Sequence, residues 1–393
     1  MNERAEKSET MDRKRNNQDQ QAELRHLSED RRSVFLFCSG IDDVLGGSSK
    51  VAGIQVQMSF WARIFAKNGW QIMSFSEHQQ TTWSDETIFV KRSSSWLCTF
   101  FHLQILLELN DCLKCIRRKP TMVITRGASR YLYFLVWLCR MKKVALVHFG
   151  ASDSDFVPGN ELLAGSKANR IMYQKSIKRI DRIVIQNKEQ KEALKRYYGK
   201  DGLVMSNIWI PKDVDVLIKR YDAIWIANLR PLKRAEWFVR LSRELPYFQF
   251  AIVGGAGKQN YYDSIKTEAE QLNNLDFLGA QSFKKVDELV SQSRLLVCTS
   301  EFEGFPNTFL QAWAQDIPVV STVNPSGVIS EFGLGSLIQN EVELSTAVKE
   351  LLTSYTLYDQ CQKNIGNYFA AHHDADKAYL KVMEMIGFNK HKQ

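Results

Sequence analysis

The sequence predicts an α/β protein with two Rossmann-like domains that face one another across a cleft. The chain has 393 residues, of which 44% are hydrophobic and 24% charged, so it is long enough for two globular cores. Short apolar runs alternate with segments of helical periodicity, which is typical of parallel sheets covered by helices. The alternation pauses once, around Asn207–Pro211, and we interpret this pause as the linker between the domains.

The domain boundaries follow from the same pattern. Residues 1–32 are rich in charged and amide side chains and almost free of large apolar ones, so we expect a disordered polar tail and no signal peptide. We expect an N-terminal domain over residues 33–209, a C-terminal domain over residues 210–372 and a closing helix or tail over residues 373–393.

The first α/β unit begins with Ser33–Cys38, an apolar run that predicts a buried strand. A glycine-containing loop follows, and apolar residues at helical spacing predict a helix over Val51–Asn68. Gly46 and Gly47 lie in the loop, at the carboxyl edge of the predicted sheet, where a Gly-rich segment can approach a ligand. The alternative is a flexible turn without a ligand.

Further units follow at similar intervals. In the first domain we predict strands at Thr121–Thr125, Lys143–Phe149 and Arg182–Gln186, and helices at Tyr131–Arg140, Ile171–Ile180 and Lys188–Tyr198. In the second domain we predict strands at Ala223–Ala227, Phe248–Val253, Leu275–Leu278, Leu295–Cys298 and Pro318–Ser321. The helices predicted there are Lys233–Arg243, Tyr261–Leu272, Val286–Gln292, Thr308–Ala314, Val342–Ser354, Asp359–Phe369 and Ala375–Met385.

The net charge of the chain indicates the kind of partner but does not identify one. The formal net charge of +8 indicates acidic partners, such as nucleic acid, an anionic membrane or a phosphorylated small molecule. No apolar run reaches the ~20 residues of a membrane span. Trp96–Leu109 predicts a buried helix, with a helix resting on an anionic membrane as the alternative. The seven cysteines predict reduced thiols in a cytoplasmic protein, and the isolated pair Cys112 and Cys115 does not predict a metal site.

The stretch Ser300–Ala314 follows a predicted buried strand and carries the clearest binding signal. A helix that begins near Asn307 has free N–H groups, which suit a phosphate or sugar hydroxyls. Glu303 precedes this helix and Gln311 lies one turn inside it, and both can bond to a polyhydroxylated ligand. The candidate binding residues between them are Gly304, Phe305, Pro306, Asn307 and Thr308. The alternative is a Gly-Pro turn ahead of an ordinary core helix.

A basic loop follows the first strand of the second domain, at an edge that faces the cleft in this fold class. Arg230, Lys233 and Arg234 are three cations in five residues, and we expect the three to neutralise a diphosphate, Arg230 by its fork and Lys233 as a point charge. A solvated basic turn is the alternative, although the dipole at a helix start disfavours it. In the first domain His148 ends a strand, from where it can bond to a sugar hydroxyl.

These segments resemble motifs of family 4 glycosyltransferases, the group 1 retaining enzymes with the GT-B fold. The spacing from Glu303 to Gln311 resembles the family's Glu-x7-Glu motif, with Gln in place of the second Glu. Lys233 is similar to the family's diphosphate-binding lysine, whereas Asn228 stands at the position of its arginine, so Arg230 would substitute. His148 and the pair Gly46-Gly47 also resemble family motifs, and the resemblance covers roughly residues 33–330.

The resemblance implies a retaining glycosyltransferase, with a hexose expected, that uses a nucleotide-diphosphate sugar as co-substrate and needs no metal. It implies that Glu303 and His148 hold the donor sugar, Lys233 and Arg230 the diphosphate, and Gln311 the ribose. We expect a glycan or lipid-linked acceptor, a role in cell-surface polysaccharide or glycolipid biosynthesis, and a cytoplasmic protein that binds peripherally to the inner membrane face. We expect no nucleic-acid partner. The alternative is a weak or inactive nucleotide-sugar-binding protein of the same fold.

Overall fold

The computed structural model describes residues 32–41, 44, 53–76, 87–94, 104–161, 165–210, 218–303 and 305–388. Its strands form two parallel sheets, one of seven strands in the order β3-β2-β1-β4-β5-β6-β7 and one of six in the order β10-β9-β8-β11-β12-β13. In both sheets the order reverses beside the first strand, as in doubly wound folds. The prediction of two α/β domains is confirmed.

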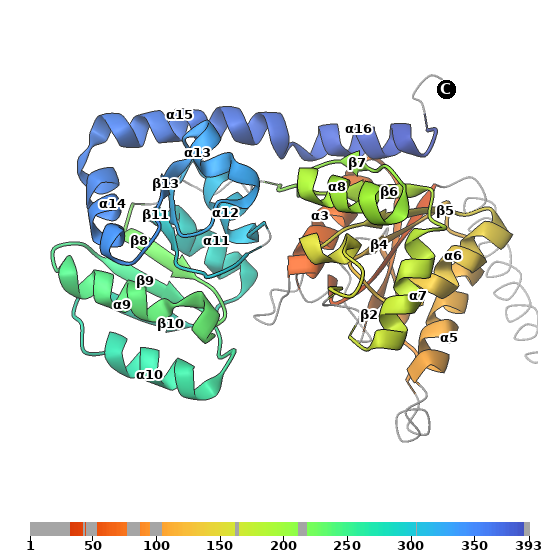
Figure 1. Cartoon of the computed structure of the whole chain (residues 1–393), viewed down its shortest axis with the longest axis horizontal. Coiled ribbons are helices and arrows are strands. Elements are labelled where there is room, and N and C mark those ends of the chain that lie inside the picture. The colour runs from red at the N-terminus through yellow and green to blue at the C-terminus, as the bar shows by residue number, and fades with distance from the viewer. Residues whose placement is uncertain are drawn as a thin grey trace, which may run out of the picture.

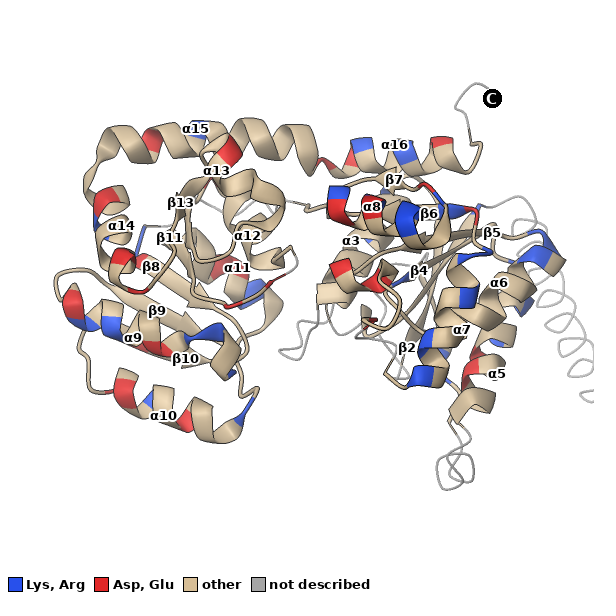
Figure 2. Ribbon diagram, viewed as in Figure 1, with Lys and Arg blue, Asp and Glu red and all other residues tan. Residues whose placement is uncertain are grey.

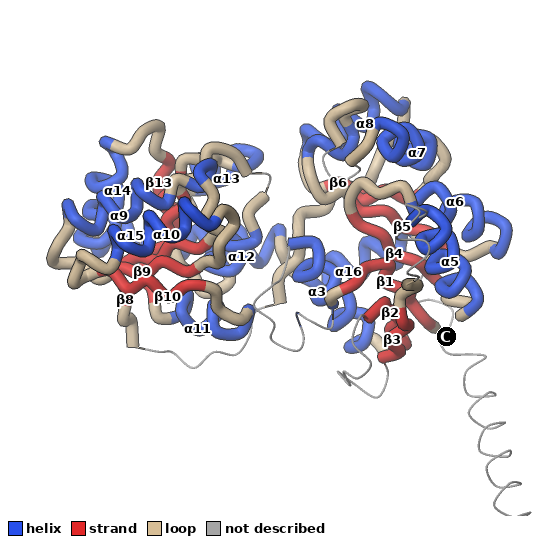
Figure 3. Tube along the Cα trace, turned by 90° about the horizontal axis from the view of Figure 1, so that it is seen from below, coloured by secondary structure: helices blue, strands red, loops and turns tan. Residues whose placement is uncertain are grey.

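The first domain contains the seven-stranded sheet. Its strands are β1 (Ser33–Ser39), β2 (Gln71–Ser76), β3 (Thr87–Lys91), β4 (Met122–Arg126), β5 (Ala145–Phe149), β6 (Arg182–Ile185) and β7 (Leu203–Val204). Its helices are α3 (Gly53–Lys67), α5 (Gln104–Arg117), α6 (Tyr131–Lys142), α7 (Lys167–Ile177) and α8 (Lys188–Tyr198), with a 3-10 turn η1 (Asp153–Phe156) after β5. The sequence pattern did not predict β2, β3 and β7. In Figure 3, α3 and α16 lie on one side of this sheet, and α5 and α6 lie on the other.

The second domain contains the six-stranded sheet. Its strands are β8 (Tyr221–Ile226), β9 (Phe250–Val253), β10 (Leu275–Gly279), β11 (Ser293–Cys298), β12 (Val319–Ser321) and β13 (Gly335–Leu337). Its helices are α9 (Ala235–Glu244), α10 (Gln259–Ala269), α11 (Phe283–Ser291), α12 (Asn307–Trp313), α13 (Val328–Phe332) and α14 (Val342–Thr353), with 3-10 turns η3 (Pro231–Lys233) and η4 (Pro325–Gly327). The helix predicted from Lys233 begins two residues later, because Arg234 takes a left-handed conformation with φ of 50°.

The last two helices connect the domains. The 18-residue helix α15 (Tyr355–His372) packs on the second domain, and α16 (Ala375–Met385) packs against α3 of the first, so the two helices run in a row along one side of the molecule (Figure 1). The Trp70 indole N–H donates to the hydroxyl of Tyr379 at 2.9 Å, and both side chains are buried. The chain therefore passes between the domains twice, once after β7 and once after α15.

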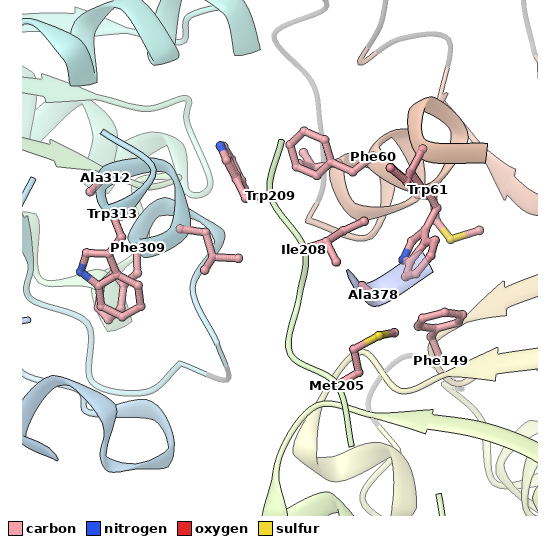
Figure 4. Close-up of a cluster of buried hydrophobic side chains, with 14 of the residues drawn as sticks. Phe60, Trp61, Phe149, Met205, Ile208, Trp209, Phe309, Ala312, Trp313 and Ala378 are labelled. Atoms are coloured by element: carbon pink, nitrogen blue, oxygen red, sulfur yellow. The ribbon is translucent and has the colours of Figure 1, made fainter. Parts of the chain in front are cut away.

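Aromatic side chains pack where the two domains meet. Trp209, in the first crossing, lies with its ring centroid 4.8 Å from Phe60 of α3 and 5.9 Å from Phe283 of α11. Figure 4 shows Trp209 and Ile208 between the core residues of α3 and those of α12. Burial of these rings removes apolar surface from water and fixes the crossing segment against both domains.

No helix in the described part of the chain is both long and apolar enough to cross a bilayer.

Candidate functional site

A cleft of about 680 Å³ lies between the domains at the carboxyl ends of β8 and β11. The first domain contributes Gly53, Ser152 and Asp153 to its walls. The second domain contributes most of the residues that the sequence analysis singled out, namely Asn228, Arg230, Lys233, Glu303, Pro306, Asn307 and Thr308. The cleft thus brings the predicted basic loop and the predicted helix start together at the switch point of the second sheet.

The position of Lys233 follows from the pairing of β8 with β11, which places the loops after these strands side by side. The indole N–H of Trp225 donates to the hydroxyl of Thr299 at 2.9 Å, and that hydroxyl donates to the backbone carbonyl of Lys233 at 2.7 Å. Trp225 and Thr299 are buried, so their hydrogen bonds are shielded from water. The backbone at Lys233 is therefore held by the core of its own domain.

Arg234, the third cation of the basic loop, does not point into the cleft. Its guanidinium donates to the backbone carbonyls of Thr299 and Ser300 at 2.8 and 3.0 Å and stacks on Trp237. The expectation of three cations for a diphosphate is thereby reduced to Arg230 and Lys233. Arg234 instead fastens the basic loop to the segment that carries Glu303.

Lys233 and Glu303 form an ion pair within the cleft, and the hydroxyl of Ser300 also donates to the Glu303 carboxylate at 2.8 Å. Both charged side chains are about four-fifths buried, with 18% and 21% exposed. Charges so placed interact more strongly than on the open surface. A phosphate that enters the cleft would find Lys233 already positioned and could take the place of Glu303 as its partner.

Arg230 is exposed, and its side chain lies along the backbone of Gly257. A Cβ at position 257 would come within 2.4 Å of the Arg230 Cγ, so the glycine makes room for this side chain. Asn228 is also exposed and lines the same cleft.

The start of α12 is bound to the first domain. The Asn307 amide donates to the backbone carbonyl of Gly53 at 3.2 Å and accepts from the amide of Gln57 at 3.2 Å. Gln57 is buried and also bonds the backbone of Ile208 in the crossing segment. Asn307 therefore joins the two walls of the cleft. Phe305 does not line it; its ring packs near Trp313, with the centroids 6.1 Å apart.

Gln311 lies in a smaller hollow of about 210 Å³ that shares Asn228, Asn307 and Thr308 with the cleft. Its amide donates to the Asp287 carboxylate of α11, and the side chain is only 3% exposed. Sequence spacing predicted that Gln311 faces a ligand, and the structure places it next to the cleft with its amide directed to Asp287.

His148 is not part of the cleft. Its side chain is fully buried, with Nδ1 2.9 Å from the hydroxyl of Thr125 and Nε2 3.0 Å from that of Tyr173. Burial, together with the nearby Arg126 charge, lowers the pKa of His148 to about 3. The structure therefore gives this histidine a core position, in contrast to the predicted contact with the donor sugar.

The burial of His148 predicts a dependence of stability on pH. Because its pKa is lowered to about 3 in the folded protein, the unfolded chain takes up a proton near pH 6.5 that the folded protein does not. The stability that it contributes is therefore lost as pH falls below 6.5. In His148→Gln, we expect the drop in unfolding free energy from pH 7 to pH 5 to be smaller by about 2 kcal/mol. Urea unfolding of the wild type and the variant at both pH values measures this difference. An equal drop in unfolding free energy in the two proteins would contradict the prediction.

Several residues that line the cleft were not predicted from the sequence. Asp153 follows β5, and its carboxylate accepts from Asn187 and Gln190 at 2.7 and 3.1 Å. The sequence contains a capping box, Ser152-x-x-Asp155, which indicates the turn that carries Asp153. Phe302, 67% exposed at the cleft, carried no signal that distinguishes it from other aromatic residues. Gly46, Gly47 and Gly304 lie outside the described residues.

Among the described residues, no group of three His, Cys, Asp or Glu side chains is arranged to hold a metal ion.

Residues 186–367 match the sequence profile of the family described as Glycosyl transferases group 1. The match begins just after β6 of the first domain and extends through the second domain. An uncharacterized glycosyltransferase of Methanocaldococcus jannaschii is similar to this chain, with 25% identity over 250 residues. That match covers 56% of this chain and 60% of the relative, so the chain spans less than two thirds of the relative's length.

Solved structures of glycosyltransferases share the fold. Sucrose-phosphate synthase from Thermosynechococcus elongatus superposes with a TM-score of 0.68 at 13% identity, covering 91% of this chain and 98% of that one. An α-glucosyltransferase in complex with UDP and a 13-mer DNA gives a TM-score of 0.59 at 14% identity, covering 91% and 100%. The two-domain architecture of this chain is therefore the GT-B fold.

Proposed function

We propose that this protein is a retaining glycosyltransferase that transfers a sugar from a nucleotide-diphosphate sugar to an acceptor hydroxyl. The observation that supports it most is the shared position of Lys233, Arg230 and the start of α12 in one cleft between the domains. Two cations and the backbone N–H groups near Asn307 and Thr308 converge there, as a departing diphosphate requires.

The work assigned to the cleft is electrostatic. As the bond from the sugar to the diphosphate breaks, negative charge grows on the phosphate oxygens, and Lys233 and Arg230 stabilise it at fixed positions. Glu303 then exchanges its ion pair with Lys233 for hydrogen bonds to the donor sugar. The ribose would lie toward Gln311 in the adjoining hollow. The sugar, expected to be a hexose, and the role in polysaccharide or glycolipid assembly remain parts of the proposal.

Ligand screening tests the proposal. A panel of nucleoside diphosphates and their sugars is added to the full chain, and the true donor should raise the melting temperature by mass action. Donor hydrolysis or transfer is then measured with the stabilising compound for the wild type and for Glu303→Ala. Stabilisation without turnover would favour a nucleotide-sugar-binding protein. No stabilisation by any member, or wild-type turnover in Glu303→Ala, would contradict the assigned site.

We further propose that an anionic membrane binds the first domain through α5 and α6. Tyr133, Trp137 and Met141 lie four residues apart on α6, and 36%, 62% and 57% of these residues are exposed. Exposed cations stand at the ends of these helices, namely Arg117, Arg118, Lys119, Arg140, Lys142 and Lys143. In the ribbon of Figure 2, positions occupied by Lys or Arg (blue) lie on α6 and on the neighbouring α7. Apolar residues beside cations suit the interface of an anionic bilayer.

Sedimentation with vesicles checks this surface. We expect the protein to bind phosphatidylglycerol vesicles at low salt and to dissociate at high salt, with weak binding to phosphatidylcholine. Trp137→Ser should weaken binding about tenfold, since it removes a large side chain from the interface. Tyr247→Ser, at an exposed position of the second domain, is the matched control. Absence of binding to phosphatidylglycerol at low salt would contradict the proposal.

A further inference from the structure

The first domain contains a pocket of its own, of about 280 Å³, at the carboxyl ends of β1 and β4. These two strands are neighbours, and the order of the sheet reverses between them, so the pocket occupies the switch point of the first sheet. Ligands of open α/β sheets bind at such points. The donor cleft takes the equivalent position in the second sheet, which leaves this second crevice without an assigned ligand.

A buried cation lines the pocket. Arg126, at the end of β4, is only 7% exposed, and its Nε finds no hydrogen-bond partner in the described part of the chain. One of its terminal nitrogens donates to the side chain of Asn207. The charge of Asp155 acts on Arg126, but it leaves the guanidinium Nε without a hydrogen-bond partner among the described residues. Burial lowers the pKa of Arg126 to about 10, so the group stays charged at neutral pH. A buried charge of this kind is stabilised when an anion binds next to it.

The remaining walls add a second cation and apolar surfaces. Arg92 lies over the ring of Phe75 and is fixed by Asp111, whose carboxylate accepts its Nε–H at 3.2 Å. Phe37 and Tyr131 line the pocket with ring centroids 4.6 Å apart. Because Arg92 is already paired, Arg126 supplies the uncompensated positive charge. The volume is below the usual range of about 300–1,000 Å³ for ligand pockets, which limits the occupant to one small group.

The first turn of α3 separates this pocket from the donor cleft. Gly53 lines the cleft, and the next two residues, Ile54 and Gln55, line the pocket. A molecule that places one end in the pocket can therefore reach toward the cleft past the start of this helix.

We propose that the Arg126 pocket binds an anionic group, a phosphate or carboxylate, carried by the acceptor. The assignment to the acceptor rests on the proposed glycosyltransferase function, whereas the anion site itself does not. The acceptor would then be a phosphorylated or acidic sugar or lipid whose attacking hydroxyl lies one helical turn away from its charge.

Binding of small anions tests the site. Calorimetry is done on the full chain with Lys233→Ala as background, so that the phosphate affinity of the donor cleft is reduced. We expect glucose 6-phosphate or glucuronate to bind, inorganic phosphate to compete, and neutral glucose not to bind. Whichever of glucose 6-phosphate and glucuronate binds more tightly shows whether the pocket prefers a phosphate or a carboxylate. Adding Arg126→Met should weaken anion binding at least tenfold, while Arg196→Met, at an exposed position on α8 of the same domain, should not change it.

Loss of anion binding must be distinguished from loss of folding in the Arg126 variant. Arg126→Met retains the apolar stem, and Asn207 still accepts from Gln186, so we expect a folded protein, which circular dichroism and melting temperature check. If this variant unfolds, Arg92→Gln is used in its place and should weaken anion binding. Equal binding in the Arg126 variant and its control, or no anion binding in the Lys233→Ala background, overturns the proposal. If instead the proposed glycosyltransferase function is wrong, the ligand screen will show no rise in melting temperature with nucleoside diphosphates or their sugars.

Discussion

Replacing Lys233 by alanine is expected to reduce donor turnover about 10²–10³-fold, the usual loss when one group that stabilises developing charge is removed. The Lys233 ammonium lies in the cleft in contact with Glu303. Its removal takes away a positive charge and leaves the negative charge of Glu303 without a cation partner. Both changes weaken the electrostatic attraction of the cleft for a diphosphate. Steady-state turnover with the donor identified by the ligand screen measures the effect.

A matched lysine and a double variant make this test specific. Lys285→Ala removes a lysine of the same domain that is 47% exposed and pairs with Glu288 on its own helix, and it should retain wild-type turnover. Since Lys233 and Glu303 contact one another, the double variant Lys233→Ala, Glu303→Gln should lose less than the sum of the two single changes. Turnover of Lys233→Ala equal to that of Lys285→Ala would disprove the diphosphate assignment.

Gly254→Ala is expected to destabilise the second domain by about 3 kcal/mol or more, at the upper end of the cost of overpacking. A Cβ at position 254 would lie 1.8 Å from the backbone oxygen of Ala227, and this main chain cannot move aside cheaply because the Ala227 N–H donates to the carbonyl of Val253 at the end of β9. Because Ala227 leads into the basic loop, the change should also displace Arg230. We expect the melting temperature to fall by roughly 6–12 °C for a domain of this size.

The neighbouring glycine provides the control. At position 255 the nearest atom, the Cβ of Ala280, would be 3.5 Å away, which is ordinary van der Waals contact. Gly255→Ala should therefore melt within a few degrees of the wild type. Scanning calorimetry of the two variants decides the matter, and similar melting temperatures for both would show that the loop after β9 adjusts freely.

Sequence patterns predicted the fold well where elements are long or strongly apolar, and less well elsewhere. The helices α8 and α16 were predicted with the bounds that the structure has. The strand β2 was not predicted because its sequence, Gln71–Ser76, mixes polar and apolar residues although most of it is buried. Strands β7 and β13, of two and three residues, are too short to show a period.

For the site, local spacing placed residues at the correct edge of the sheet but not the direction of every side chain. Lys233 and Asn307 were predicted near one another, and they line one cleft. His148 was predicted at a strand end, and it is there, but Thr125 and Tyr173 enclose it from distant parts of the chain. Arg234 was counted with the cleft cations, although the carbonyls of Thr299 and Ser300 hold it. Such long-range partners leave no trace in local sequence.

The double passage of the chain between the domains limits how they can move. One connection would allow the domains to swivel in any direction, whereas two adjacent connections define a single axis. His373 and Asn207 mark that axis, because the imidazole Nδ1 lies 2.7 Å from the Asn207 carbonyl oxygen. We therefore expect a hinge motion of the two domains about this contact. Such a motion changes the width of the cleft without sliding its walls past one another.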